Sequence, residues 1–201
     1  MLVTAFEPFN DEKVNSSLEV LKKLPNIIDG IEIIKLELPV VRYDSLSLTY
    51  ETARLMKPDI ILCLGEAGGR DKISYERIGI NIDDYRIPDN ANNKPIDEKI
   101  FEDGKDAYFS SIPNKKIVEK INEKSDIACI SNTAGTFVCN HVFYGIHYYI
   151  DKGYLKLDAG FIHFPYLKEQ TTNKINMPYM NIYEMVETLI VTIRILSGNQ
   201  K

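Results

Sequence analysis

The sequence has 201 residues, of which 44% are hydrophobic and 26% charged, and its net charge is −5. This is the length of one domain and the composition of a globular protein. The sequence has no Lys/Arg cluster that would indicate nucleic acid binding, and no apolar run of the ~20 residues that a membrane-spanning helix needs. The N-terminus lacks the basic start and the cleavage site of a signal peptide, so we predict a single domain over residues 1–201 in the cytoplasm.

Apolar periodicity predicts alternating strands and helices. In chain order we expect a strand at residues 2–6, a helix at 16–24, a strand at 31–38, a helix at 44–56, strands at 60–64 and 73–82, a helix at 115–124, a strand at 127–130, a helix at 138–150, a strand at 159–164 and a helix at 181–196. In the second helix Asp44 is the expected N-cap, and the expected apolar anchors are Leu46, Leu48, Leu55 and Met56. Buried strands separated by helices indicate an α/β fold with a mostly parallel sheet covered on both faces.

Three cysteines compete for the role of a nucleophile. Cys63 and Cys129 lie within apolar runs, where a thiol behaves as a small, inert hydrophobe. Cys139 follows a predicted strand and the turn at residues 131–136, and it stands in the first turn of the next helix. Because a helix N-terminus favours negative charge, we expect a lowered pKa for this thiol and backbone N–H groups aimed at an oxyanion. No cysteine spacing indicates a disulfide or a zinc site.

A cysteine nucleophile needs a proton acceptor and donor, usually histidine. His141 and His147 follow Cys139 on the same predicted helix, by two and by eight residues, so neither can reach the thiol and we interpret both as ordinary packing or surface residues. His163 ends a strand at the sheet edge where sites gather, which makes it the candidate base by elimination. For Glu76, the alternation of its strand alone favours an exposed carboxylate paired with a neighbouring arginine.

Short motifs that follow one another along nearly the whole chain carry a family resemblance. They are residues 4–9, 13–17, 38–40, 57–59, 65–70, 73–78, 84–90, 131–140 and 160–166. In this order they resemble the motifs of pyroglutamyl peptidase type I, a family of cysteine peptidases also called pyrrolidone carboxyl peptidases. Residues 131–140 resemble the family's cysteine signature, and residues 160–166, Gly-Phe-Ile-His-Phe-Pro-Tyr, resemble its histidine segment. One such motif would be weak, but all of them in order are specific.

The resemblance implies a role for particular residues. It implies a triad of Cys139, His163 and Glu76, which includes the cysteine and histidine that the residue pattern selects and gives Glu76 a function. It implies that Arg86 lies near the oxyanion. It also implies a set of substrate-binding residues, which are Phe6, Phe9, Asn15, Ile87, Phe137 and Val138.

The same resemblance implies the fold and the reaction. The implied fold is a three-layer α/β sandwich of the phosphorylase/hydrolase-like kind, with helices on both faces of a mixed, mostly parallel sheet. The implied reaction removes an N-terminal pyroglutamyl residue from peptides through a thioacyl-enzyme, without a metal or an organic cofactor. The implied assembly is a homotetramer.

The chain departs from the family pattern at a few positions. Asn10 and Asp11 replace two glycines, Ser16 replaces a proline, Glu66 a glutamine and Tyr85 a small residue. We expect the extra carboxylate of Glu66 to raise the pKa of the cysteine or to alter the substrate range. Three alternatives stay open: a catalytically silent binding protein of the same fold, a nucleoside-phosphorylase-like transferase with phosphate at residues 65–70, and a general cysteine amidase.

Overall fold

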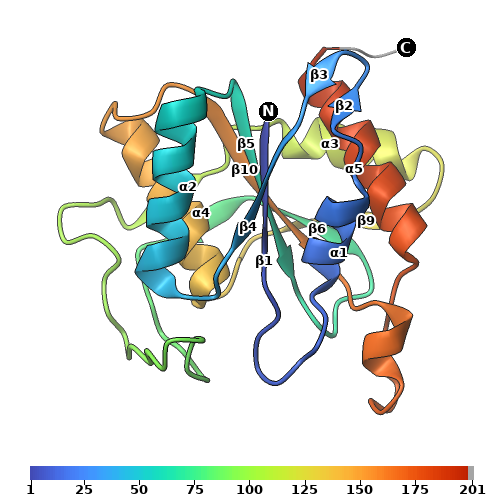
Figure 1. The fold of residues 1–201 in the computed structure, drawn as a ribbon, viewed down its shortest axis with the longest axis horizontal. Coiled ribbons are helices and arrows are strands. Elements are labelled where there is room, and N and C mark those ends of the chain that lie inside the picture. Colours follow the sequence, from blue (N-terminus) through green and yellow to red (C-terminus); the bar gives the residue numbers. More distant parts are fainter. Residues whose placement is uncertain (199–201) are drawn as a thin grey trace.

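The computed structural model describes residues 1–198 and centres on a six-stranded sheet (Figure 1). Across the sheet the strands are β4 (Ile34–Leu38), β1 (Leu2–Phe6), β5 (Ile60–Glu66), β10 (Asp158–Phe164), β6 (Ile73–Glu76) and β9 (Ala128–Ser131). The first four run parallel, β6 runs antiparallel to β10, and β9 runs parallel to β6. The predicted mixed, mainly parallel sheet is confirmed.

Helices cover both faces of this sheet (Figure 1). One layer contains α1 (Ser16–Lys23), α3 (Asn114–Asn122) and α5 (Ile182–Leu196), and the other contains α2 (Arg42–Met56) and α4 (Val138–Asp151). Because side chains alternate along a strand, β5 places Leu64 in the core under the first layer and Cys63 in the core under the second. The predicted three-layer sandwich is therefore confirmed.

Shorter elements lie outside the sheet. They are β2 (Ile27–Ile28) paired with β3 (Ile31–Glu32), β7 (Ile78–Ile80) paired with β8 (Ala107–Phe109), and the 3₁₀ helix η1 (Lys168–Thr171). Two strands predicted as continuous, 31–38 and 73–82, are therefore each divided. The second division falls at Arg77, whose backbone N–H donates to the carbonyl of Ser131 at 2.8 Å before the chain leaves the sheet to pair with β8.

The start and the buried face of α2 differ from the prediction. The helix begins at Arg42, and Asp44 lies within its first turn rather than at its N-cap. The backbone N–H of Arg42 donates to the carboxylate of Asp89, 3.1 Å away, so a residue distant in sequence satisfies this helix end.

The expected apolar anchors of α2 also prove mostly wrong. Leu46 is buried, but Leu48, Leu55 and Met56 are exposed. The helix instead buries Ser45, Thr49 and Ala53 beside Leu46, which packs onto Gly145 of α4 so closely that a Cβ there would lie 2.3 Å from a Leu46 methyl group. Close contact between two helices requires small residues, and this requirement overrides the apolar pattern.

Candidate active site

Glu76 and His163 approach each other on neighbouring strands. Glu76 stands opposite Phe161 in the antiparallel register of β6 and β10, so its side chain shares a sheet face with His163, two residues further along β10. The Nδ1 atom of His163 lies 2.8 Å from Oε1 of Glu76. A carboxylate only accepts hydrogen bonds, so Nδ1 carries the proton and Nε2 faces away from Glu76. Glu76 is fully buried, and the prediction of an exposed strand carboxylate is wrong.

Arg70 holds the same carboxylate oxygen as His163 does. Arg70, in the turn between β5 and β6, donates from Nη1 to Oε1 of Glu76 at 2.6 Å and from Nη2 to the carbonyl of Thr133 at 3.2 Å. Burial would raise the pKa of Glu76, but the hydrogen bond and charge of His163, with the charge of Arg70, outweigh it and hold this pKa below its usual range. The carboxylate is therefore ionised at neutral pH.

Cys139 is the second residue of α4, after the N-cap residue Phe137. The first N–H groups of a helix have no intrahelical acceptor, so the N–H of Cys139 is available beside its own thiol. The preceding turn depends on Gly135, whose φ of +77° is unfavourable for residues with a Cβ. The hydroxyl of Thr136 in this turn donates to the carbonyl of Asp84 at 2.7 Å, which ties the turn to the segment that carries Arg86.

Gly65 fixes how close the thiol and the imidazole lie. A Cβ built on this residue of β5 would be 3.0 Å from Sγ of Cys139 and 2.9 Å from Cδ2 of His163. The two side chains therefore meet over one backbone position, with less than ~6 Å between these two atoms. Cδ2 is bonded to Nε2, so the ring nitrogen left free by Glu76 is on the side of the thiol.

The thiol is not activated in the resting structure as the sequence predicts. Burial raises the pKa of Cys139 well above its usual range, and the charges of Glu76 and Glu66 raise it further, whereas Arg70 lowers it. The expected lowering by the helix N-terminus is wrong, because desolvation disfavours the thiolate more than the helix dipole favours it. The expectation that Glu66 raises this pKa agrees with the structure.

The other cysteines lie in the sheet. Cys63 is buried in β5, and burial raises the pKa of its thiol to about 12, in line with an inert core residue. Cys129 belongs to β9 at the edge of the sheet and is only partly buried, so the prediction of a buried residue is wrong for Cys129. An edge strand lacks a neighbour on one side, which local apolar runs do not reveal.

The residues expected to line a substrate pocket fall into two groups. Phe9 and Phe137 are partly exposed and have ring centroids 5.9 Å apart, and Tyr85 packs edge-on against Phe137 at 4.6 Å. Phe6 and Val138 are buried in the core beneath the α2–α4 layer. Phe9 and Phe137 therefore form a partly exposed apolar surface beside the start of α4, and the buried ring of Tyr85 supports it from below.

Three further residues implied by the resemblance differ in their surroundings. Ile87 is partly exposed. Arg86 is exposed, and its side chain makes no hydrogen bond or ion pair with any residue in 1–198. Asn15 is buried: its Oδ1 accepts from the N–H of Ser17 at 3.0 Å and its Nδ2 donates to the carbonyl of Glu7 at 3.1 Å. Asn15 thus caps α1 and holds the loop that follows β1.

Comparisons with known proteins place this geometry in a family. The family model described as pyroglutamyl peptidase matches residues 1–199. The chain belongs to the pyroglutamyl peptidase family. It is 51% identical over 193 residues to a pyrrolidone-carboxylate peptidase from Brachyspira hyodysenteriae, with 96% of each chain covered. It is 50% identical over 201 residues to one from Thermoanaerobacter pseudethanolicus, covering 100% of this chain and 99% of that protein.

Solved structures support the same assignment. The crystal structure of pyroglutamyl peptidase I from Bacillus amyloliquefaciens matches with a TM-score of 0.90 at 42% identity, covering 94% of this chain and 90% of that one. A mutant pyrrolidone carboxyl peptidase from Pyrococcus furiosus matches with a TM-score of 0.92 at 40% identity, covering 99% of both chains. As a member of this family the chain is a cysteine peptidase.

Three residues at or after the end of β5 have contacts that the sequence does not reveal. Arg70 and Gly65 lie in the glycine-rich segment that also suggests a phosphate cradle, but the structure commits Arg70 to Glu76. Glu66 points to the other side of the sheet, where Oε2 accepts from the backbone N–H of Ser16 at 2.6 Å and from Nε2 of Gln170 at 2.8 Å. The signal for all three is their place at the carboxyl end of a buried strand.

A buried ion cluster includes His141, which lies on α4 two residues beyond the thiol. Nδ1 of His141 is 2.8 Å from Oδ2 of Asp83, and Nε of Arg42 is 3.2 Å from the same oxygen. His147, further along α4, places Nδ1 2.8 Å from the carbonyl of Phe143. Both His141 and His147 are buried, so of the two expected roles the structure supports packing, and His141 belongs to an ionic network that the sequence does not indicate.

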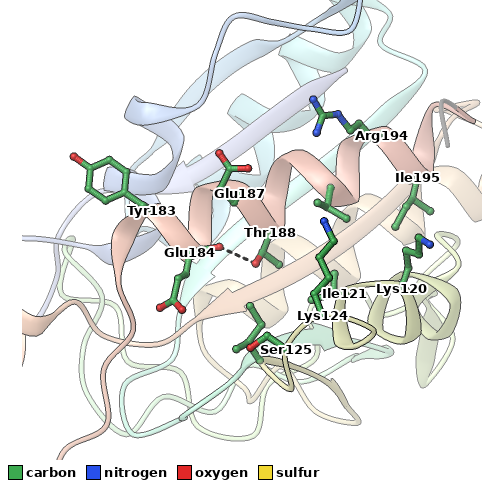
Figure 2. A pocket seen from close by; sticks show the side chains of 12 residues that line it. Lys120, Ile121, Lys124, Ser125, Tyr183, Glu184, Glu187, Thr188, Arg194 and Ile195 are labelled. Atoms are coloured by element: carbon green, nitrogen blue, oxygen red, sulfur yellow. Dashed lines mark hydrogen bonds between the residues drawn. The ribbon is translucent and has the colours of Figure 1, made fainter. Parts of the chain in front are cut away.

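A cavity of about 730 Å³ lies between α3 and α5, on the face of the sheet opposite α4 (Figure 2). Its rim includes Lys120 and Lys124 from the α3 side and Glu184, Glu187 and Arg194 from α5 (Figure 2). None of the candidate catalytic residues lines it. Within residues 1–198 there is no group of His, Cys, Asp and Glu side chains suited to a metal ion, and no helix long and apolar enough to cross a membrane.

Proposed function

We propose that this protein removes an N-terminal pyroglutamyl residue from peptides, with Cys139 as nucleophile, His163 as base and acid, and Glu76 as the group that orients His163. Membership of the pyroglutamyl peptidase family supports the reaction. The observation that carries the residue roles is that the thiol and the imidazole both lie over Gly65, with Glu76 hydrogen-bonded to Nδ1 on the other side of the imidazole.

The raised pKa of Cys139 supports a resting enzyme in which the thiol is neutral and must lose its proton during the attack. Nε2 of His163 takes the thiol proton as the sulfur attacks the carbonyl that joins the ring to the peptide. Glu76 stabilises the imidazolium that results, because it is ionised and accepts a hydrogen bond from Nδ1. The negative charge on the carbonyl oxygen is met by the N–H of Cys139 at the α4 N-terminus, and we propose that Arg86 adds a second contact there.

The second half of the reaction uses the same histidine. His163 returns its proton to the leaving amine, so the peptide departs without its first residue and a thioester remains on Cys139. Water then loses a proton to Nε2 and attacks the thioester, which releases pyroglutamate and restores the thiol. These steps need no metal or organic cofactor, since every proton is taken up and returned by His163.

We propose that Phe6, Phe9, Asn15, Ile87, Phe137 and Val138 shape the subsite for the lactam ring. A flat ring suits the partly exposed faces of Phe9 and Phe137, and the amide of the ring needs hydrogen-bond partners once it is buried. An open-chain glutamyl residue carries a charge that this apolar surface does not neutralise, so the subsite would reject it.

The test is release of a chromophore from a pyroglutamyl reporter amide under reducing conditions, by wild type and by Cys139→Ser. We expect turnover by wild type and a loss of at least ~1,000-fold in the variant, because a serine hydroxyl is a far weaker nucleophile here than a thiol. Prolyl and glutamyl reporter amides serve as matched substrates. A folded, reduced wild type that releases no pyroglutamyl product contradicts the proposal.

We further propose that residues 1–201 act as one cytoplasmic domain and assemble as a homotetramer. The two helical layers share a single sheet, which supports one domain. Catalysis by a free thiol suits a reducing compartment. The family resemblance supports the tetramer, and the exposed Tyr183 beside the α3–α5 cavity offers apolar surface for contacts. Light scattering that gives the mass of a monomer would contradict the assembly.

A further inference from the structure

Arg70 joins the two halves of the candidate site. Its Nη1 donates to the carboxylate of Glu76 at 2.6 Å, and its Nη2 donates to the carbonyl of Thr133 at 3.2 Å. Glu76 orients the base, and Thr133 lies in the turn that leads to Cys139. A single planar group thus joins the strand that carries the carboxylate to the turn that precedes the nucleophile, which is a geometry that suits arginine.

The turn that presents Arg70 is specialised for this position. Gly69 has a φ of +90°, which a residue with a Cβ rarely adopts. A Cβ on Gly68 would lie 2.1 Å from the ring of Tyr166, so that aromatic ring covers the turn closely. The backbone N–H of Arg70 closes the turn on the carbonyl of Ala67 at 3.3 Å. The local chain therefore fixes where the guanidinium lies.

The charges around Glu76 explain why a fixed cation matters there. Three titratable groups surround Glu76: His163 from β10, Cys139 from α4 and Arg70 from the β5–β6 turn. On the other neighbouring strand, β9, the residue opposite Glu76 is the uncharged Ser131. His163 is neutral for part of each reaction cycle. In that interval Arg70 supplies the only full positive charge among these neighbours, and a buried carboxylate without a counter-charge is strongly disfavoured.

We propose that Arg70 is a positioning residue for catalysis: it keeps the buried Glu76 ionised throughout the reaction cycle and binds the turn before Cys139 to the same carboxylate. The proposal rests on the roles assigned above to Glu76 and Cys139. It goes beyond them because Arg70 acts through both groups and contacts neither the substrate nor the reacting atoms.

Arg70→Gln tests the charge, because glutamine keeps a donor and loses the cation. We expect kcat/KM to fall about 100-fold and the acid limb of its pH profile to move up by about one pH unit. Without the cation the coupled Glu76–His163 pair takes up a proton at higher pH, which gives the sign of this shift. Arg70→Lys keeps the charge but cannot reach both partners, so its acid limb stays near that of wild type while kcat/KM falls by less.

Arg77→Gln is the matched control, since Arg77 follows Glu76 directly in sequence but makes no side-chain hydrogen bond or ion pair within residues 1–198. It should leave the acid limb in place. The proposal is overturned if folded Arg70→Gln keeps the wild-type profile, or if Arg70→Lys or Arg77→Gln moves the limb as far as Arg70→Gln does.

Alkylation of Cys139 by iodoacetamide across the pH range separates this proposal from the proposed function. It needs no substrate, and Arg70 lowers the pKa of Cys139, so the midpoint of alkylation should move to higher pH in Arg70→Gln and not in Arg77→Gln. If wild type fails to cleave the pyroglutamyl reporter, the proposed function fails while this measurement still decides the role of Arg70. An unchanged midpoint in Arg70→Gln contradicts that role.

Discussion

Gly65 is the residue whose substitution tests the packing of the site most directly. A Cβ at this position would lie 2.8 Å from Cε1 of Phe161, 2.9 Å from Cδ2 of His163 and 3.0 Å from Sγ of Cys139. Non-bonded carbon atoms are separated by ~3.5–4.0 Å at their optimum, so each of the three neighbours must move by ~0.5–1 Å in Gly65→Ala. Two of the three belong to the proposed catalytic groups.

The size of the effect follows from these displacements. A misplacement of ~1 Å between reacting groups can reduce the rate ~100-fold, so we expect kcat to fall between ~10-fold and ~100-fold. Overpacking of a buried position typically costs ~1–3 kcal/mol of stability, which leaves the protein folded if its stability is ordinary. The variant should therefore lose activity far more than it loses structure.

The assay compares kcat on the pyroglutamyl reporter with the melting temperature for Gly65→Ala and Gly160→Ala. Gly160 is a buried glycine of β10, and a Cβ there would lie 2.3 Å from Cδ1 of Ile112 on the opposite face of the sheet. Both variants should melt earlier, but only Gly65→Ala should lose kcat. A folded Gly65→Ala with more than half of the wild-type kcat would refute the packing argument.

Two further substitutions test buried charges. In Glu66→Gln the loss of a carboxylate that raises the pKa of Cys139 should speed alkylation of the thiol at neutral pH by less than ~10-fold, and slower alkylation would contradict the assignment. Burial also raises the pKa of Glu66 in the folded protein above the unfolded value of ~4.3. Wild type therefore loses stability as the pH rises from the unfolded to the folded pKa of Glu66, and the glutamine variant lacks this loss. The melting temperature of Glu66→Gln relative to that of wild type should consequently rise from pH 4 to pH 7. Asp83→Asn removes the charge that Arg42 and His141 share and leaves Arg42 with Glu98, 2.9 Å from Nη1, as its remaining carboxylate partner. It should cost ~1–3 kcal/mol in urea unfolding, whereas no measurable cost would show that the cluster is not structural.

Local pattern identifies the elements but not their order in the sheet. The apolar runs of β5 and β10 predict buried strands, and the strand–turn–helix sequence before Cys139 predicts the nucleophile. The insertion of β10 between β5 and β6, and the reversed direction of β6, depend on pairings between residues 87 positions apart, such as His163 with Glu76. Such long-range pairing leaves no local periodicity, so without the resemblance Glu76 is read as an exposed residue.

The wrong predictions of a lowered Cys139 pKa and of Asp44 as the N-cap of α2 have related physical causes. The pKa of Cys139 is set by how deeply the thiol is buried and by Glu76 and Glu66, all of which depend on the folded chain. The start of α2 is set by Asp89, which lies 47 residues after Arg42. Helix caps and pKa values that rest on distant neighbours are outside the reach of a local sequence window.

The central place of β10 also sets when during synthesis the enzyme can act. Within residues 1–198 this strand comes last along the sequence, yet it joins β5 to β6 and carries His163. A nascent chain of 157 residues already contains Cys139 and Glu76, but the inner edges of β5 and β6 are unpaired and the base has not been made. Such open edges readily pair with other chains, so the synthesis of β10 both completes the catalytic site and covers two edges that could otherwise aggregate.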